Sequence, residues 1–167
     1  MIHINITRTQ DDHQNIAVPK AAKPLKILIV DDSLILRRNM AGMLLSMGHT
    51  VAGEAKNGNE AILQYMQLKP DLVTMDITMP DMDGIAAVKE IRAKDPKANI
   101  IMVTSHGQEE MVISAIKAGA KGYLLKPLDA QKLSISIAKA FNDDVKKIVP
   151  SSISHFDDID DIVIPEF

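Results

Sequence analysis

The sequence of 167 residues contains no cysteine and no tryptophan, and aromatic residues make up only 3% of it. The lack of cysteine excludes disulfide bonds and thiolate metal sites, and it fits a reducing cytosol. Hydrophobic residues nevertheless account for 46% of the chain, and ten of them are methionines. The sequence therefore predicts a core built from aliphatic side chains and methionine.

Other features that are missing exclude further classes of protein. No apolar run approaches the roughly 18 residues of a membrane span, and the first thirty positions lack the apolar core of a signal peptide. The formal net charge of −3 argues against non-specific binding of nucleic acid. The five histidines are scattered without ligand spacing, and no glycine-rich phosphate loop is present. We expect a soluble cytoplasmic protein that binds neither DNA nor a membrane.

Short apolar runs alternate five times with stretches of helical periodicity. Strands are predicted at residues 25–30, 50–55, 71–75, 99–104 and 122–125, and helices at about 34–47, 58–68, 84–93, 108–118 and 130–147. Ser33 and Asp129 are expected to cap the first and last of these helices. Right-handed crossovers would then give an α/β fold, a doubly wound five-stranded parallel sheet with helices on both faces.

The domain predicted from this pattern covers residues 25–147. Residues 1–24 are polar, contain two prolines near their end and are interpreted as a flexible N-terminal extension. Residues 148–167 form a tail in which acidic and apolar residues are mixed. We expect no separate output domain.

Four of the predicted strands end in polar residues: Asp31-Asp32, Asp76, Thr104 and Lys126. The carboxyl ends of parallel strands meet at one edge of a sheet, so these groups are expected to converge on one pocket. Three carboxylates about 4 Å apart would repel each other by about 4 kcal/mol per pair at an effective dielectric near 20. A single lysine cannot neutralise them. Their oxygen ligands suit Mg²⁺ better than zinc.

Such a site favours the transfer of a phosphoryl group to a carboxylate. In this interpretation Asp76 is the nucleophile, Lys126 neutralises charge on the phosphoryl oxygens, and the Thr104 hydroxyl donates a hydrogen bond to one of them. Each residue alone has an ordinary explanation, such as a helix cap or a solvated strand end. The interpretation depends on their joint appearance at successive strand ends.

At these residues the chain resembles the response-regulator receiver family, the bacterial phospho-accepting switch domains with the flavodoxin-like fold. The motifs that carry the likeness are Val30-Asp31-Asp32-Ser33, Met75-Asp76 followed by Pro80 and Gly84, Thr104-Ser105, and Tyr123 with Lys126-Pro127. The likeness covers residues 25–147, and it implies that a sensor histidine kinase or a phosphotransfer protein phosphorylates Asp76. The protein would then be a switch with self-catalysed phosphoryl transfer and dephosphorylation, not an enzyme.

The resemblance also assigns residue roles. It implies a Mg²⁺ ion held by Asp31, Asp32, Asp76 and the backbone carbonyl of Thr78. It implies that Thr104 moves toward the phosphate and that Tyr123 then turns inward. Thr78 and His106 occupy two variable positions that the family associates with phosphate lifetime, although an exposed loop histidine is an equally good interpretation of His106.

Two other classes of function compete with this one. A covalent phosphatase could also use Asp76, but such enzymes usually carry a second Asp two residues later, where this chain has Thr78. A structural interaction module would usually have lost one of the key residues. The output of a switch is expected to be protein contact, as in chemotaxis or phosphorelay regulators, through the 122–147 face and the 150–167 tail. We expect a monomer or a weak, phosphorylation-dependent dimer.

Residues 150–167 hold five acidic side chains and no lysine or arginine. Phe156, Ile159, Ile162 and Val163 fall at helical spacing, with four aspartates on the other side. A tail that only aids solubility is one interpretation, but such tails are usually poor in Ile and Phe. The alternative is a docking segment for a basic, apolar groove. This groove would belong to a partner or to the protein's own switch face near Lys132, Lys139, Lys146 and Lys147.

Overall fold

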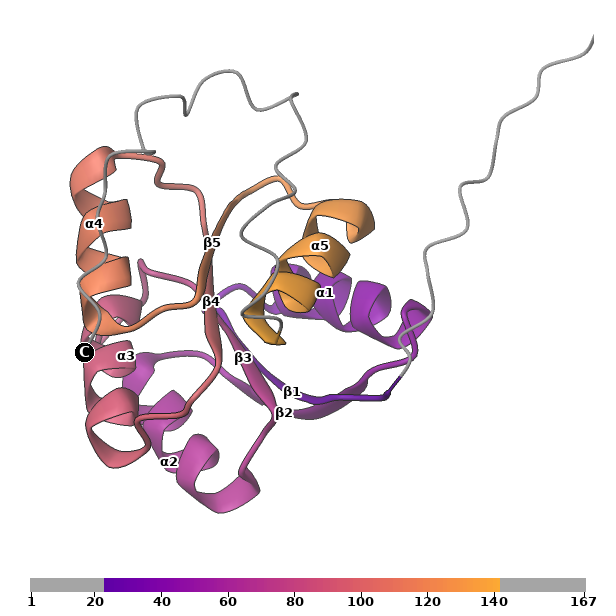
Figure 1. Ribbon diagram of the computed structural model, residues 1–167, viewed down its shortest axis with the longest axis horizontal. Coiled ribbons are helices and arrows are strands. Elements are labelled where there is room, and N and C mark those ends of the chain that lie inside the picture. Colours follow the sequence, from indigo (N-terminus) through magenta and orange to yellow (C-terminus); the bar gives the residue numbers. More distant parts are fainter. Residues whose placement is uncertain (1–22, 142–167) are drawn as a thin grey trace, which may run out of the picture.

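Five parallel strands form a single sheet in the order β2-β1-β3-β4-β5 (Figure 1). The structure is a computed structural model that describes residues 23–141. The strands are β1 (Lys26–Val30), β2 (Thr50–Ala55), β3 (Leu72–Met75), β4 (Ile100–Thr104) and β5 (Gly122–Leu125). The helices are α1 (Leu34–Ser46), α2 (Gly58–Leu68), α3 (Gly84–Lys94), α4 (Glu109–Ala118) and α5 (Ala130–Phe141). The doubly wound, flavodoxin-like fold predicted from the sequence is confirmed.

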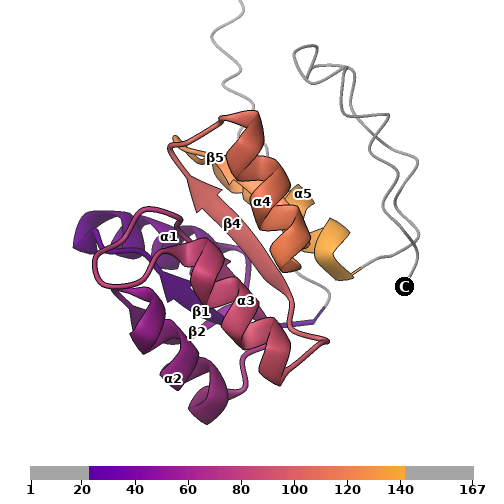
Figure 2. The ribbon, with the colours of Figure 1, turned by 90° about the vertical axis from the view of Figure 1, so that its left-hand side faces the viewer.

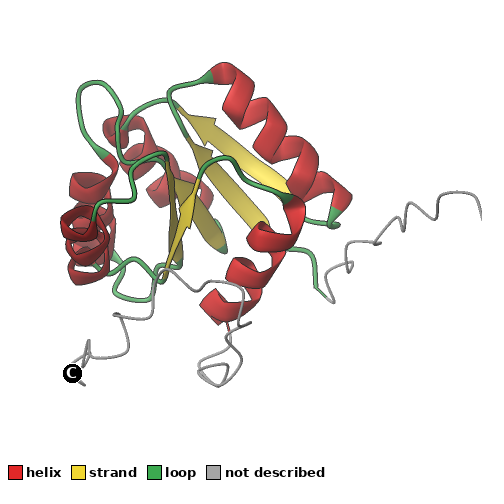
Figure 3. Ribbon diagram, turned by 90° about the horizontal axis from the view of Figure 1, so that it is seen from above, coloured by secondary structure: helices red, strands yellow, loops and turns green. Residues whose placement is uncertain are grey.

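The helices lie in two layers with the sheet between them (Figure 3). Helices α1 and α5 cover one face of the sheet, and α2, α3 and α4 cover the other (Figures 1 and 2). Helix α1, which follows β1, covers one face of the sheet, whereas α3, which follows β3, covers the other (Figure 2). The neighbouring strands β1 and β3 are therefore followed by segments that lead to opposite faces. In open parallel sheets a crevice forms outside the strand ends at such a point. The ends of β1 and β3 therefore mark the place to look for a site.

The core has two parts, one on each face of the sheet. On β1, Ile27 and Ile29 pack toward α1 and α5, whereas Leu28 and Val30 pack toward α2, α3 and α4. Because side chains alternate along a strand, a strand buried on both faces must be apolar at successive positions. This is why the continuous apolar runs of the sequence identified the strands correctly.

The helix boundaries follow local capping chemistry. The side chains of Ser33, Asn57 and Asp83 accept hydrogen bonds from backbone amides in the first turns of α1, α2 and α3. The Asp129 carboxylate accepts from the amide of Lys132 at 2.8 Å and so caps α5 as predicted. The predicted extension of the last helix toward residue 147 lies outside the described residues.

Some apolar side chains at helical spacing remain on the surface. Leu36 on α1 and Leu68 on α2 are 38% and 39% exposed, although their neighbours Met40 and Tyr65 are buried. Their places at the edges of the apolar stripes explain the difference. Within residues 23–141, no helix is long and apolar enough to cross a membrane.

Candidate functional site

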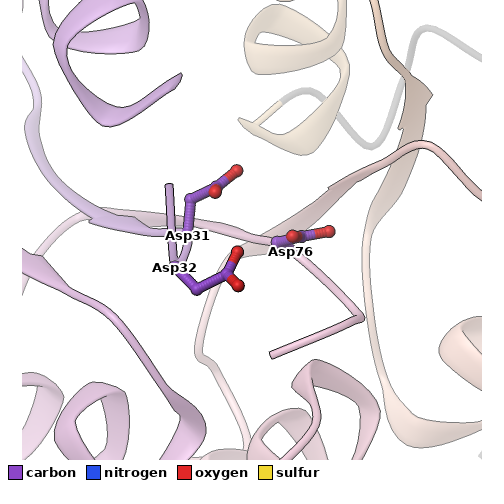
Figure 4. Close-up of side chains that lie close together, drawn as sticks. All are labelled: Asp31, Asp32 and Asp76. Carbon is purple, nitrogen blue, oxygen red and sulfur yellow. The ribbon is translucent and has the colours of Figure 1, made fainter. Parts of the chain in front are cut away.

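Three carboxylates gather where β1 and β3 leave the sheet. Each of Asp31, Asp32 and Asp76 offers an oxygen, and these atoms all lie within 4.8 Å of one another. Figure 4 shows the three side chains side by side at the strand ends. The strand register explains their meeting, since Val30 and Met75, the residues that precede Asp31 and Asp76, are paired across the sheet. The structure thus brings together the carboxylates that the sequence placed at one edge.

Asp76 is held in place by the backbone around it. Its amide donates to the carbonyl of Val30 at 2.9 Å, and its Oδ1 accepts from the amide of Ile77 at 2.8 Å. The residue is 6% exposed. Burial raises the pKa of the Asp76 carboxyl, and the positive charge of Lys126 opposes that rise only in part. The buried carboxylate of Asp76 therefore holds a proton more readily than that of an ordinary, exposed aspartate.

Lys126 follows β5 and reaches across to two of the carboxylates. Its Nζ lies 2.7 Å from Oδ2 of Asp31 and 3.4 Å from Oδ2 of Asp76. The amide of Lys126 also donates to the carbonyl of Thr104 at 2.9 Å, which fixes the end of β5 to the end of β4. The lysine side chain is only 15% exposed, so solvent screens these contacts weakly. One ammonium group therefore contacts two of the three acidic side chains of the cluster.

The donor set fits a hard divalent cation. Carboxylate oxygens are the ligands that Mg²⁺ prefers, and the ion keeps several of its waters. Asp31 and Asp76 are buried, while Asp32 is exposed and leaves one side of the cluster open to solvent. Thr78 lies on the exposed loop that follows Asp76. Its carbonyl as a further ligand stays a prediction.

A chain of hydrogen bonds links the end of β4 to Tyr123. The fully buried Thr104 accepts a hydrogen bond at Oγ1 from the amide of His106 at 3.3 Å. The carbonyl of His106 in turn accepts from the hydroxyl of Tyr123. Burial raises the pKa of Tyr123, and the negative charge of Asp76 adds to that rise. The backbone of His106, which the sequence gave no role, thus joins two predicted switch residues.

The contacts of two further residues that shape the site were not predicted from the sequence. A Cβ on Gly84 would lie 1.9 Å from the carbonyl oxygen of Asp76, so only glycine fits there. Arg37 on α1 donates to the carbonyl of Asp31 at 2.8 Å and pairs with Glu54 at 2.9 Å. In the sequence Gly84 was named as part of the family motif without a role of its own, and no sequence pattern marks Arg37.

Fold and site together define a class of protein. A buried aspartate lies at a strand end, beside a cluster suited to a divalent cation, a lysine, and a threonine linked to a tyrosine. This set of groups is that of a phospho-accepting signalling domain. The comparisons with known proteins agree, because the model of the family described as response regulator receiver domain matches residues 27–138. The chain belongs to that family.

Individual relatives point to one branch of the family. The chain is 49% identical to the chemotaxis protein CheY of Thermotoga maritima over 114 residues, which are 68% of this chain and 95% of the relative. It is also 49% identical to CheY of Bacillus subtilis over 117 residues, 70% of this chain and 98% of the relative. A similar solved structure is the CheX-CheY-BeF3-Mg²⁺ complex from Borrelia burgdorferi. It has a TM-score of 0.70 and 36% identity, and the match covers 71% of this chain and 90% of that one.

Proposed function

We propose that the chain is a stand-alone response regulator that accepts a phosphoryl group on Asp76 and signals by protein contact. The observation that carries the proposal is the position of Asp76. This buried carboxylate shares a space within 4.8 Å with Asp31 and Asp32 and lies 3.4 Å from the Lys126 ammonium. The functional unit would be residues 25–147.

The donor would be the phosphohistidine of a sensor kinase or of a phosphotransfer protein. In the transfer, a carboxylate oxygen of Asp76 forms a bond to phosphorus while the phosphorus–nitrogen bond breaks. The electron pair stays on the imidazole, which takes up a proton. Mg²⁺, held by Asp31, Asp32, Asp76 and the Thr78 carbonyl, would neutralise charge on the phosphoryl oxygens.

Lys126 and Thr104 would complete the site after transfer. The Lys126 ammonium lies near enough to Asp76 to pair with a phosphoryl oxygen on it. The Thr104 hydroxyl would move from the amide of His106 to donate to the phosphate. That movement would free space for Tyr123. Thr78 and His106 would set how fast water reaches the phosphate. Dephosphorylation by the protein itself would reset the switch.

The surfaces beside the site suit two kinds of partner. Leu34 and Ile35, in the first turn of α1 next to Asp32, are 55% and 72% exposed and would meet the phosphodonor. Output would leave through the 122–147 face, where Leu125 and Ile135 are 37% and 39% exposed. Residues 142–147 of that face, and the 150–167 tail, lie outside the described residues. The setting would be cytoplasmic signalling in chemotaxis, which is the process that the names of the CheY relatives give, or in a phosphorelay.

Acetyl phosphate provides a direct test. With Mg²⁺, intact mass spectrometry should show one added phosphoryl group that is sensitive to hydroxylamine, as an acyl phosphate is. Asp76→Asn should abolish the addition, and chelation of Mg²⁺ should suppress it in the natural sequence. Asp81→Asn is the matched control, because Asp81 is an exposed loop carboxylate whose positive φ of 67° asparagine tolerates. Equal labelling of the Asp76→Asn variant would overturn the proposal.

A further inference from the structure

The edge of the sheet opposite to Asp76 carries a basic groove. It is an open depression of about 480 Å³ lined by Arg92 at the end of α3, Pro96 and Lys97 in the next loop, Lys121 before β5, and Phe141 at the end of α5. Figure 2 shows the end of α5 beside the start of β4. The mechanism proposed above uses none of these residues.

The groove combines positive charge with apolar surface. Among residues 23–141, the side chains of Arg92, Lys97 and Lys121 make no ion pair. The nearby carboxylate of Asp95 accepts from the Tyr65 hydroxyl at 2.7 Å and from the Lys97 amide at 3.0 Å, and it forms no ion pair with these three side chains in the described part of the chain. Phe141 leaves 43% of its surface exposed at the end of the groove. A ligand for this groove should be acidic and should carry apolar side chains.

The chain itself contains such a ligand. We propose that residues 156–163, the acidic–apolar segment, bind to the basic groove of the same molecule. The segment holds four aspartates and no basic residue, and its apolar residues are Phe156, Ile159, Ile162 and Val163. Residues 150–167 carry five negative charges, whereas the rest of the chain carries a formal charge of +2. The charges of groove and segment are therefore opposite.

Connection to α5 makes this binding possible even at low intrinsic affinity. The chain from Phe141, which lines the groove, to Phe156 can span at most about 50 Å. A tether of this length keeps the segment at an effective concentration of about 1 mM. A dissociation constant of about 1 mM for the separate peptide is then enough to fill the groove half of the time. The groove therefore selects this segment over free peptides of similar affinity.

The absence of cysteine allows a specific test in the full-length protein. The variant Ser154→Cys would contain a single cysteine, two residues before Phe156. A nitroxide label would therefore attach at that position alone. We expect it to broaden the amide resonances of Lys97, Lys121 and Phe141. The broadening should weaken in about 1 M salt, where the Debye length falls to about 3 Å.

Charge reversal identifies the groove as the docking site. Lys97→Glu with Lys121→Glu should remove most of the broadening, and adding Asp157→Lys with Asp158→Lys should restore it. Lys132→Glu with Lys139→Glu, on exposed positions of α5, is the matched control and should leave it unchanged. Arg92 is kept, because it donates to the carbonyl of Ala98 at 3.3 Å and supports the fold. Broadening centred on Lys132 and Lys139, or spread evenly over the surface, would overturn the proposal.

Discussion

The Lys126 ammonium lies closer to Asp31 than to the proposed phosphate acceptor, at 2.7 Å from Asp31 and 3.4 Å from Asp76. In this state the lysine occupies the space between two carboxylates that a metal ion would share. Lysine and cation therefore compete for the same negative charge. This relationship gives the first prediction.

Lys126→Met should have opposite effects on stability and on metal binding. Without Mg²⁺ it leaves three carboxylates uncompensated and should lower the free energy of unfolding by about 3 kcal/mol. With the competing charge removed, Mg²⁺ should bind at least about tenfold more tightly. Unfolding followed by circular dichroism and titration calorimetry measure the two effects. Lys132→Met is the control, because its pair with Asp129 at 3.7 Å is exposed and should contribute less than about 1 kcal/mol.

A second prediction concerns pH. Burial raises the pKa of Asp76, so the ionised carboxylate is less favourable in the folded protein than in the unfolded chain. The contribution of Asp76 to the free energy of unfolding is therefore fully present at low pH, where the carboxyl is protonated. It is lost as the pH rises through the raised pKa of the folded protein. At pH 7 without Mg²⁺, Asp76→Asn should be more stable by about 2 kcal/mol, because the desolvation of the buried carboxylate outweighs the attraction of Lys126. The difference should shrink toward about pH 3.5, below the ordinary carboxyl pKa of about 3.9.

Denaturant unfolding at pH 7 and at about pH 3.5 tests this sign. Addition of Mg²⁺ should raise the stability of the natural sequence more than that of Asp76→Asn, because the variant offers one charged ligand fewer. The exposed Asp81→Asn should show neither effect. A variant less stable than the natural sequence at pH 7 would contradict the electrostatic account of the site.

Much of this site followed from the sequence because parallel strands place their ends at one edge. Apolar runs located β1 and β3, and the next residue after each was an aspartate. The missed contacts depend on distances between backbones. Neither the closeness of Gly84 to the Asp76 carbonyl nor the bridging role of the His106 backbone leaves a mark in composition or periodicity. Side-chain type predicts strand ends, but it does not predict how closely loops pack.

Two glycines provide a third, paired prediction. At Gly84 an alanine Cβ would lie 1.9 Å from the Asp76 carbonyl oxygen, so the backbone of Asp76 would have to move. Gly84→Ala should therefore cost about 3 kcal/mol or more and weaken Mg²⁺ binding. At Gly42, on α1, a Cβ would meet nothing within 4 Å, and Gly42→Ala should stabilise the protein by about 1 kcal/mol. Thermal unfolding compares the two, and equal effects would contradict the close contact at Gly84.

The last prediction concerns the link from Thr104 to Tyr123. If the hydroxyl of Thr104 moves from the His106 amide to the phosphate, it carries the signal between Asp76 and the aromatic ring. Thr104→Ala should still be phosphorylated by acetyl phosphate, because Asp76 and the acidic cluster remain. The change in the Tyr123 ring resonances on binding beryllofluoride and Mg²⁺ should fall by half or more. Thr104→Ser, which keeps the hydroxyl, should retain most of it.

The aromatic-poor composition makes this measurement simple, since Tyr65 is the other of the chain's two tyrosines. Tyr65 is 3% exposed on α2 and donates to Asp95 at 2.7 Å, so it serves as an internal reference that should not respond. Its hydroxyl is bonded to the loop before β4, and no hydrogen bond within residues 23–141 links it to Thr104 or Tyr123. A full Tyr123 response in Thr104→Ala would show that the ring senses the phosphate without the threonine. The charge of Asp76, which adds to the effect of burial in raising the pKa of Tyr123, would then be the direct route between the two residues.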